Sequence, residues 1–402
     1  MTDHAKQTSS QIKYPDGVKW DSPLHLRPVY EVLEETVKNY GTHPAFDFLG
    51  KRWTWSEIGE LVNRVALGLQ NYGVTRGKHV GLFLPNSPYF LVFYYAILRA
   101  GGTVVNYNPL YAEKELEHQI EDSQTDIMVT CDLQMLVDKM DKALSNTRLS
   151  RLVICPFTDI LPFPKNVLFK TFKGKELAKI KASRFSDRYI HWDNLIANSG
   201  KPDHVHIDLD KDIAVLQYTG GTTGTPKGAV LTHGNICANI EQSALWFYKA
   251  EEGKEKMLGI LPFFHVFAMT TVMNIAVKNA FEIIALPRFD LNQALKLIDK
   301  KKPHYFPAVP AIYSAINNHP KVDKYDLTSL RYCISGGAPL PVEVKKEFEE
   351  KTGCVVVEGY GLTEASPVVC ANPIEGLNKA GSIGMPFPGT TVEIIDRDDQ
   401  KT

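Results

Sequence analysis

Strand-like and helix-like segments alternate along most of this sequence, and this alternation limits the possible folds more than any other feature. Apolar runs at 79–84 and 103–107 are separated by a helical pattern at 89–100, and the same rhythm returns many times afterwards. Strands that alternate with helices favour mostly parallel sheets covered by helices. The strand signals are too many for one comfortable sheet, so we expect an α/β fold with two packed parallel-sheet subdomains and helices in between. Further strands are expected at 126–130, 151–155, 213–219, 257–261, 282–286, 304–306, 331–335 and 355–358.

The composition is typical of a globular chain in a reducing compartment. Its 402 residues are 44% hydrophobic, which excludes disorder over most of the length. The net charge of −1 provides no overall field for nucleic acid, so no nucleic-acid partner is expected. The six cysteines form no C-x-x-C pair, and no secretory signal pattern opens the sequence. The uncharged run 258–277 contains Pro262 and other polar breaks, which argue against a membrane span. We therefore expect a cytoplasmic protein.

A basic excursion interrupts the alternation between residues 157 and 207. Its part 165–188 carries eight Lys or Arg residues against two acidic ones, with phenylalanines interspersed. The simpler interpretation is a solvated surface segment. The alternative is a peripheral contact with the inner face of an anionic membrane, because basic and aromatic side chains act together at lipid headgroups. Both interpretations stay open on the sequence alone.

The most informative segment is the glycine-rich run Tyr218-Thr-Gly-Gly-Thr-Thr-Gly-Thr-Pro-Lys-Gly228, which directly follows a strand signal. Glycines let several N–H groups converge, threonines add hydroxyl donors, and Lys227 adds positive charge. Together these groups suit a polyphosphate. The run matches neither G-x-x-x-x-G-K-[ST] nor G-x-G-x-x-G, so neither a P-loop nor a hydride-transfer cofactor is indicated. The sequence also contains no G-x-S-x-G or H-E-x-x-H motif, so serine-hydrolase and catalytic-zinc chemistry have no support.

Four segments, in this order along the chain, resemble the motifs of the adenylate-forming superfamily of acyl- and aryl-CoA ligases, luciferases and peptide-synthetase adenylation domains. They are the run 218–233, Leu261-Pro-Phe-Phe-His265-Val-Phe267, Ser335-Gly-Gly-Ala-Pro339 and Glu358-Gly-Tyr-Gly-Leu-Thr-Glu364. Trp53-Thr-Trp-Ser-Glu57 and Leu98-Arg-Ala-Gly-Gly102 also fit, so the likeness extends over residues 25–396. The resemblance implies an acid–thiol ligase that activates a carboxylic acid with ATP and Mg²⁺ and transfers the acyl group to CoA.

The same resemblance implies roles for individual residues. His265, Lys227, Thr363 and Glu364 are expected to be catalytic, with His265 orienting the carboxylate and the α-phosphate. Thr219 and Glu364 are expected to hold Mg²⁺ through oxygen atoms, which this ion prefers. The expected ATP and AMP contacts are Thr219, Gly220, Gly221, Thr222, Thr223, Gly224, Lys227, Gly336, Gly337, Ala338, Pro339, Gly359, Tyr360, Gly361 and Thr363.

The second motif also bears on the class of acid. Amino-acid activators of the superfamily carry Asp directly after its aromatic residue, whereas this chain has His265 after Phe264. A buried ammonium group would lack its partner, so an amino acid is disfavoured. Phe264, Phe267 and Met269 are expected to line an apolar site for the acyl tail. The T-G-G-T-T-G form of the glycine-rich run resembles bacterial long-chain fatty-acyl-CoA ligases, and a long-chain fatty acid is therefore the expected substrate. An aryl or medium-chain acid, as in coumarate ligases, is the alternative.

The resemblance also implies how the chain is divided. The expected regions are an extension at 1–24, an AMP-binding large domain at 25–370 that contains the insertion 157–207, and the start of an incomplete β-barrel at 371–402. One sheet subdomain would come from 25–75 and 235–365, and the other from 76–220. The family's C-terminal lid, with its adenylation lysine, has no counterpart in these residues. A second class of function follows: a module that binds nucleotide and acyl-adenylate with little turnover.

Overall fold

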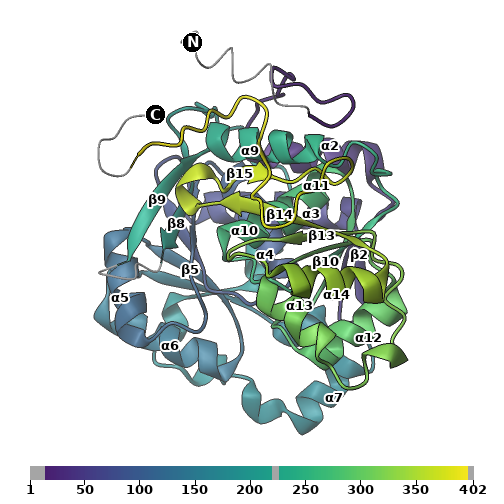
Figure 1. Ribbon diagram of the computed structural model, residues 1–402. Helices are drawn as coiled ribbons and strands as arrows, with labels where there is room; N and C mark the ends of the chain where they lie inside the picture. Colours follow the sequence, from purple (N-terminus) through teal and green to yellow (C-terminus); the bar gives the residue numbers. More distant parts are fainter. Residues whose placement is uncertain (1–13, 220–225, 397–402) are drawn as a thin grey trace.

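Two β-sheets, with helices around and between them, make up the described residues 14–219 and 226–396 of this computed structural model (Figure 1). One sheet has nine strands in the order β16-β15-β14-β13-β12-β10-β11-β1-β2, and the other has seven in the order β7-β6-β5-β3-β4-β8-β9. The strands of the nine-stranded sheet are β1 (Pro44–Phe48), β2 (Lys51–Thr54), β10 (Lys256–Gly259), β11 (Glu282–Ala285), β12 (Tyr305–Ala308), β13 (Tyr332–Ser335), β14 (Val355–Gly361), β15 (Val368–Ala371) and β16 (Met385–Pro386). Those of the seven-stranded sheet are β3 (His79–Leu82), β4 (Thr103–Asn106), β5 (Ile127–Cys131), β6 (Arg151–Cys155), β7 (Tyr189–His191), β8 (Ile213–Thr219) and β9 (Lys227–Thr232).

Both sheets are parallel in their centres and antiparallel at their edges. In the nine-stranded sheet the strands from β1 to β14 pair in parallel, while β2, β15 and β16 join antiparallel. In the seven-stranded sheet β9 joins β8 antiparallel, while the other pairs run parallel. This arrangement confirms the expected α/β fold with two parallel-dominated sheets. Although β1 and β2 precede the seven-stranded sheet in sequence, they belong to the other sheet, where Phe46 pairs with Ile283.

The helices connect the strands, and their ends follow local sequence signals. In α3 the Thr54 hydroxyl accepts a hydrogen bond from the Glu57 N–H, and the Glu57 carboxylate accepts one from the Thr54 N–H, which satisfies two free donors of the first turn. Gly353, with φ of +73°, ends α14 in the left-handed conformation that glycine adopts readily. The α-helices are α2 (Val29–Tyr40), α3 (Trp55–Asn71), α4 (Pro88–Arg99), α5 (Glu113–Asp122), α6 (Gln134–Asn146), α7 (Lys165–Phe172), α8 (Trp192–Ile196), α9 (His233–Leu245), α10 (Val266–Ala268), α11 (Ile275–Lys278), α12 (Leu291–Lys301), α13 (Pro310–Asn317) and α14 (Val342–Thr352). A π-helix spans Met269–Asn274, and short 3₁₀ turns lie at Phe157–Ile160, Gly174–Glu176, Ile180–Ala182, Ser186–Arg188, Val322–Lys324 and Thr363–Ala365.

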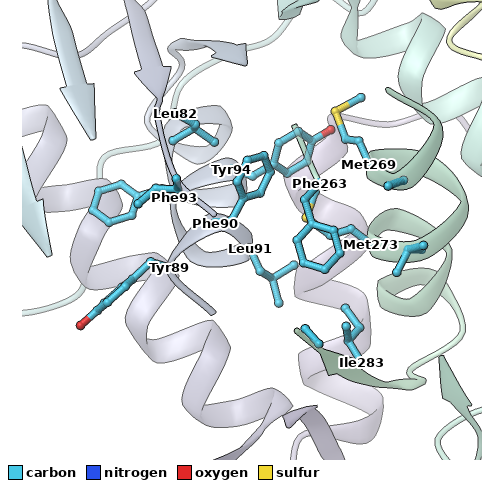
Figure 2. Close-up of a cluster of buried hydrophobic side chains, with 14 of the residues drawn as sticks. Leu82, Tyr89, Phe90, Leu91, Phe93, Tyr94, Phe263, Met269, Met273 and Ile283 are labelled. Carbon is cyan, nitrogen blue, oxygen red and sulfur yellow. The ribbon is translucent and has the colours of Figure 1, made fainter. Parts of the chain in front are cut away.

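The core that joins the two sheets is built around α4. Every residue of α4 from Pro88 to Leu98 is buried, as expected for a helix that is apolar on all sides. Figure 2 shows its aromatic residues beside Phe263, Met269 and Met273, which belong to the segment after β10. The rings of Phe90 and Phe263 lie 5.9 Å apart at an angle of 68°. Helix α4 follows a strand of one sheet and packs against residues that follow a strand of the other, so a single core holds both sheets.

The structure describes both the uncharged run 258–277 and the segment 391–396 near the end of the chain. The uncharged run 258–277 divides into the end of β10, a loop and a series of short helical turns. Among the described residues, no helix is long and apolar enough to cross a membrane. Residues 391–396, which fall in the expected start of a β-barrel at 371–402, form no strand. A strand needs hydrogen-bonded neighbours, and no described strand pairs with this segment.

Candidate active site

One cavity of about 390 Å³ collects residues that are widely separated in the sequence. Its walls come from the carboxyl ends of β8, β13 and β14, from α9, and from the helical turns that begin at α10. Open α/β sheets bind ligands at the carboxyl ends of their strands, so this is the expected place for a site. The cavity is lined by Thr219, Ser243, Trp246, Phe247, His265, Val266, Phe267, Thr271, Ile275, Ile334, Gly336, Gly337, Val357, Gly359, Tyr360, Gly361, Leu362, Thr363, Glu364, Pro367, Val368, Ala371, Ile374 and Phe387.

Most of the site residues expected from the sequence that the structure describes meet in this cavity. They come from four motifs and three strand ends, and they are Thr219, His265, Phe267, Gly336, Gly337, Gly359, Tyr360, Gly361, Thr363 and Glu364. The expected contacts Gly220, Gly221, Thr222, Thr223 and Gly224 lie outside the described residues.

Five expected residues do not line the cavity. Lys227 is the first residue of β9, where it is exposed and pairs with Thr219 across the β8–β9 ladder. Ala338 and Pro339 are exposed beyond Gly337. Phe264 is half-buried against the core, and Met269 is fully buried.

Helical geometry explains why Met269 faces the core. Phe267, Thr271 and Ile275 line the cavity at intervals of four residues along consecutive helical turns, so they lie on one face. Met269 lies halfway between two of them and points to the other side, where its sulfur accepts a hydrogen bond from the Asn106 side chain at 3.5 Å. The spacing from Phe267 therefore distinguishes the residues that face the cavity from Met269, which was expected to line it and does not.

The buried part of the cavity is apolar, and its exposed part is polar. Trp246, Phe247, Ile275, Ile374 and Phe387 are all buried. By contrast His265, Tyr360 and Glu364 are exposed, and Thr219 and Thr363 are half-buried. Such a division suits a ligand with a hydrocarbon tail and a charged head.

Aromatic residues that the sequence analysis missed form much of the buried part. Trp246 donates its indole N–H to the carbonyl of Asn372 at 3.1 Å, and its ring lies 4.4 Å from that of Phe387. Ser243, Trp246 and Phe247 share one face of α9 and its final turn, a pattern that helical spacing could have revealed. Phe387 follows the two-residue strand β16, so no periodic pattern marks it.

Ser243 is the one cavity residue in this apolar part with an unpaired buried hydroxyl among the residues described. Its side-chain oxygen has no hydrogen-bond partner, and the residue is 4% exposed. A buried hydroxyl without a partner is unfavourable. Ser243 therefore occupies a position where an apolar side chain would lose no hydrogen bond.

Glycine is required where the motifs approach each other closely. A Cβ atom at Gly336 would lie 2.9 Å from the ring of Phe267, and one at Gly361 would lie 2.2 Å from the carbonyl oxygen of Pro367. Both positions therefore exclude any side chain unless neighbouring atoms move. The loop after β13 can rest directly against the segment that carries His265 for this reason.

A backbone N–H two residues further along the chain holds His265 in one tautomer. Its Nδ1 accepts a hydrogen bond from the Phe267 N–H at 3.3 Å and so caps α10. Desolvation by the surrounding protein lowers the pKa of His265 below its usual 6.5. The imidazole is therefore neutral at pH 7 and carries its proton on Nε2, which leaves that N–H free to donate to an anion.

A chain of buried amides joins this loop to the strand that precedes the glycine-rich run. The side-chain N–H of Gln217 in β8 donates to the carbonyl of Phe264 at 2.9 Å. The side-chain N–H of Asn106 in β4 in turn donates to the Gln217 side-chain oxygen at 2.8 Å. Strands β4 and β8 belong to the seven-stranded sheet, so these bonds connect that sheet to the His265 loop.

The exposed polar part of the cavity, its mouth, offers few side-chain oxygen atoms that could bind a metal ion. No group of three or more His, Cys, Asp or Glu side chains suited to a metal ion occurs in the described part of the chain. Thr219 and Glu364 do line the same cavity and offer a hydroxyl and a carboxylate oxygen. Mg²⁺ is commonly held by one or two protein oxygens together with substrate phosphates, so this donor set fits that ion.

Comparisons with known proteins identify the family to which the chain is similar. A model of the AMP-binding enzyme family matches residues 33–402. The long-chain-fatty-acid–CoA ligase of Bacillus subtilis (strain 168) is 44% identical over 389 residues, which cover 96% of this chain and 69% of that protein. The long-chain-fatty-acid–CoA ligase of Escherichia coli O157:H7 is 32% identical over 395 residues, which cover 97% of this chain and 70% of that protein.

The fold is shared with solved structures as well. A long-chain-fatty-acid-CoA ligase from Archaeoglobus fulgidus superimposes with a TM-score of 0.79 at 24% identity. The match covers 97% of this chain and 75% of that one. The two-sheet architecture is therefore that of acyl-CoA ligases.

Proposed function

This chain belongs to the AMP-binding enzyme family, and from that premise we propose that it activates a long-chain fatty acid with ATP to form an acyl-adenylate. The acyl group then passes to CoA, as in a long-chain fatty-acid–CoA ligase. The observation that carries this proposal is the cavity at the strand ends, which has a buried apolar part and an exposed polar part.

The reaction brings two negatively charged groups together. A carboxylate oxygen attacks the α-phosphorus of ATP, and the bond from that phosphorus to the pyrophosphate oxygen breaks. The site must therefore hold both groups in line and offset their charges. We assign the neutral His265 to this task, because its Nε2–H can donate to the carboxylate or to an α-phosphate oxygen. His265 orients these groups and forms no covalent bond.

The nucleotide is assigned to the glycine-rich part of the mouth. Tyr360 is 46% exposed at the edge of the cavity, so its ring is available to stack on adenine. Gly336 and Gly337 would pass close to the base, and Thr363 would donate to the α-phosphate. Lys227 begins the strand that leaves the glycine-rich run, and an exposed lysine there is assigned to the outer phosphates.

Mg²⁺ is assigned to Thr219 and Glu364, whose oxygen atoms suit it. When bound, the ion would offset charge on the triphosphate. The carboxylate of Glu364 is exposed and makes no ion pair with any described residue, so it is available for this role.

The alternatives to this proposal are an aryl or medium-chain acid, and a module that binds the adenylate with little turnover. Calorimetry on the 402-residue chain separates them, with a non-hydrolysable long-chain acyl-AMP analogue, the coumaroyl analogue and AMP as ligands. We expect the long-chain analogue to bind most tightly, because its tail fills the apolar part of the cavity. Tighter binding of the coumaroyl analogue would contradict the fatty-acid assignment. ATP–pyrophosphate exchange stimulated by palmitate then distinguishes an active enzyme from a binding module.

We further propose that residues 165–188 make a peripheral contact with an anionic membrane, where the acid substrate is concentrated. Both the basic character of the segment and its exposed apolar side chains support this contact.

A further inference from the structure

Helix α7 presents apolar side chains to solvent on the side away from the protein. Val167 is 50% exposed, Leu168 48% and Phe172 80%, and Phe163 just before the helix is 81% exposed. Four large apolar side chains within ten consecutive residues are therefore in water. Leu168 and Phe172 are four residues apart, so they share one face of the helix. Figure 1 shows α7 at the lower edge of the molecule, opposite the chain ends.

The other side of α7 is fastened to the body of the protein. The ring of Phe169 packs against that of Phe157 at 5.3 Å. The Lys165 ammonium group donates to the carbonyl of Leu49 at 2.7 Å. After the helix, the Ala178 N–H donates to the carbonyl of Asp132 at 2.8 Å. The exposed apolar side chains therefore stand on a supported element and do not belong to a loose loop.

Positive charge is gathered around the same helix. Residues 165–188 contain eight Lys or Arg and two acidic residues, a local balance of +6, whereas the whole chain carries −1. Part of this charge is used internally, since Arg188 donates to the carbonyls of Leu144 and Ser150 and Lys173 pairs with Glu176. Four lysines make no ion pair with any residue the structure describes: Lys170, Lys175, Lys179 and Lys181.

We infer that α7 is an interfacial helix, which inserts Leu168, Phe172 and Phe163 among the headgroups of an anionic bilayer while the four unpaired lysines contact lipid phosphates. Exposed apolar side chains on α7, together with basic side chains on α7 and on the turns that follow it, match the two forces that hold proteins on such membranes. The helix has eight residues and is about 12 Å long, which is enough to lie in the interface and too short to cross it. This inference deepens the membrane contact proposed above, and its benefit to the enzyme rests on the proposed fatty-acid substrate.

The test is cosedimentation of the 402-residue chain with vesicles of phosphatidylglycerol and phosphatidylcholine, and with vesicles of phosphatidylcholine alone. Neither ATP nor fatty acid is added, so the result does not depend on catalysis. We expect binding to the anionic vesicles at low salt and a steep loss at high salt. The variant K170Q/K175Q/K179Q/K181Q is expected to bind more weakly by about fivefold for each lysine removed.

A matched control removes the same charge from four other elements. Lys38, Lys114, Lys300 and Lys346 are exposed on α2, α5, α12 and α14. The variant K38Q/K114Q/K300Q/K346Q is expected to retain vesicle binding. An equal loss in both variants would show that net charge alone attracts the protein, and would overturn the assignment to α7.

The apolar contribution is tested with L168S/F172S. This variant is expected to bind anionic vesicles about tenfold more weakly while keeping the same dependence on salt. Its control is L110S/L377S, which removes two side chains that are 80% and 82% exposed elsewhere. Unchanged binding of L168S/F172S would exclude insertion.

Two further outcomes are informative. Sedimentation velocity without lipid shows whether α7 instead covers a second copy of the chain, and a dimer that L168S/F172S dissociates would overturn the lipid assignment. Adenylation of water-soluble octanoate, measured without vesicles, reports on the proposed function separately. We expect L168S/F172S to keep that activity, so a failure of membrane binding and a failure of catalysis are distinguishable.

Discussion

The side chain of Gln217 reaches across the boundary between the two sheets and donates a hydrogen bond to the backbone carbonyl of Phe264 at 2.9 Å. Gln217 lies two residues before Thr219, and Phe264 immediately precedes His265. This bond therefore sets the distance between the strand that leads into the glycine-rich run and the loop that carries His265. Asn106 supports it from β4 by donating to the Gln217 side-chain oxygen.

Gln217 is accordingly expected to act as a positioning residue. The change Gln217→Leu removes the donor to Phe264 and leaves the Asn106 amide without this acceptor. We expect a loss of about 1–3 kcal/mol in the free energy of unfolding. We also expect the kcat of adenylation to fall about tenfold or more with little change in the KM for ATP, because a displaced His265 aligns the reacting groups poorly. Urea unfolding and pyrophosphate exchange measure the two effects.

Asn317→Leu is the matched control for this change. Asn317 is 5% exposed and donates to the carbonyl of Val344 at 3.0 Å, away from the cavity. It should cost similar stability without lowering the adenylation rate. If both variants lose rate in proportion to stability, Gln217 is a structural residue only.

The pH dependence of adenylation should report on His265. Its pKa lies below 6.5 because desolvation disfavours the charged form. As the pH falls through that pKa, Nδ1 gains a proton, can no longer accept from the Phe267 N–H, and releases the cap of α10. We expect the rate to fall on the acid side of neutrality, and His265→Ala to be slower by about 10²-fold and to lack this acid limb. His304→Gln is the control, because the pKa of His304 is also lowered by burial but the residue does not line the cavity.

His233 should make stability depend on pH. Burial lowers the pKa of its imidazole to about 4, and its Nδ1 accepts a hydrogen bond from the Val29 N–H at 3.2 Å. Between pH 4 and 6.5 the unfolded chain binds a proton that the folded chain does not. The contribution of His233 to the free energy of unfolding is therefore complete above pH 6.5 and is lost as the pH falls toward 4. The full effect is about 3 kcal/mol. Denaturant unfolding at several pH values should show this slope in the parent chain and a smaller slope in His233→Gln.

The preference of the enzyme for long over short acyl chains should depend on the size of the side chain at Ser243. Since its hydroxyl has no partner, Ser243→Phe breaks no hydrogen bond and fills part of the buried cavity. We expect palmitate to be activated at least about tenfold less well relative to octanoate, because the larger ring excludes the distal methylenes. AMP binding by calorimetry should stay unchanged. Ser243→Ala, which removes the hydroxyl without adding volume, should keep the parent preference, and a shift in both variants would argue against a steric effect.

The sequence predicted the parts of the fold that depend on regular patterns. The alternation around 331–335 and 355–358 corresponds to β13 and β14, and the residues after these strands line the cavity. Ordered motifs also predicted that Thr219, His265 and Glu364 belong to one site, and all three line the same cavity, each at or after the carboxyl end of a strand.

What the sequence could not predict depends on contacts between distant segments. Ile374 and Phe387 come from stretches with little regular structure, so no periodic pattern placed them in the cavity. The bond between Gln217 and Phe264 joins two sheets whose relative placement no local pattern determines. Residues 391–396 lie where the resemblance implies the start of a β-barrel, but a strand also requires neighbours to pair with, and these residues form none.

The place of β1 in the nine-stranded sheet has a consequence for biosynthesis. As the chain leaves the ribosome from its N-terminus, Phe46 and Phe48 emerge long before β11, the parallel partner of β1. The whole seven-stranded sheet is synthesised in the interval. Until β11 is synthesised, the hairpin of β1 and β2 has an unpaired strand edge and exposed phenylalanines. This condition favours aggregation and binding by chaperones. The nascent chain is therefore vulnerable at this hairpin from the synthesis of β2 until Ala285 has been added.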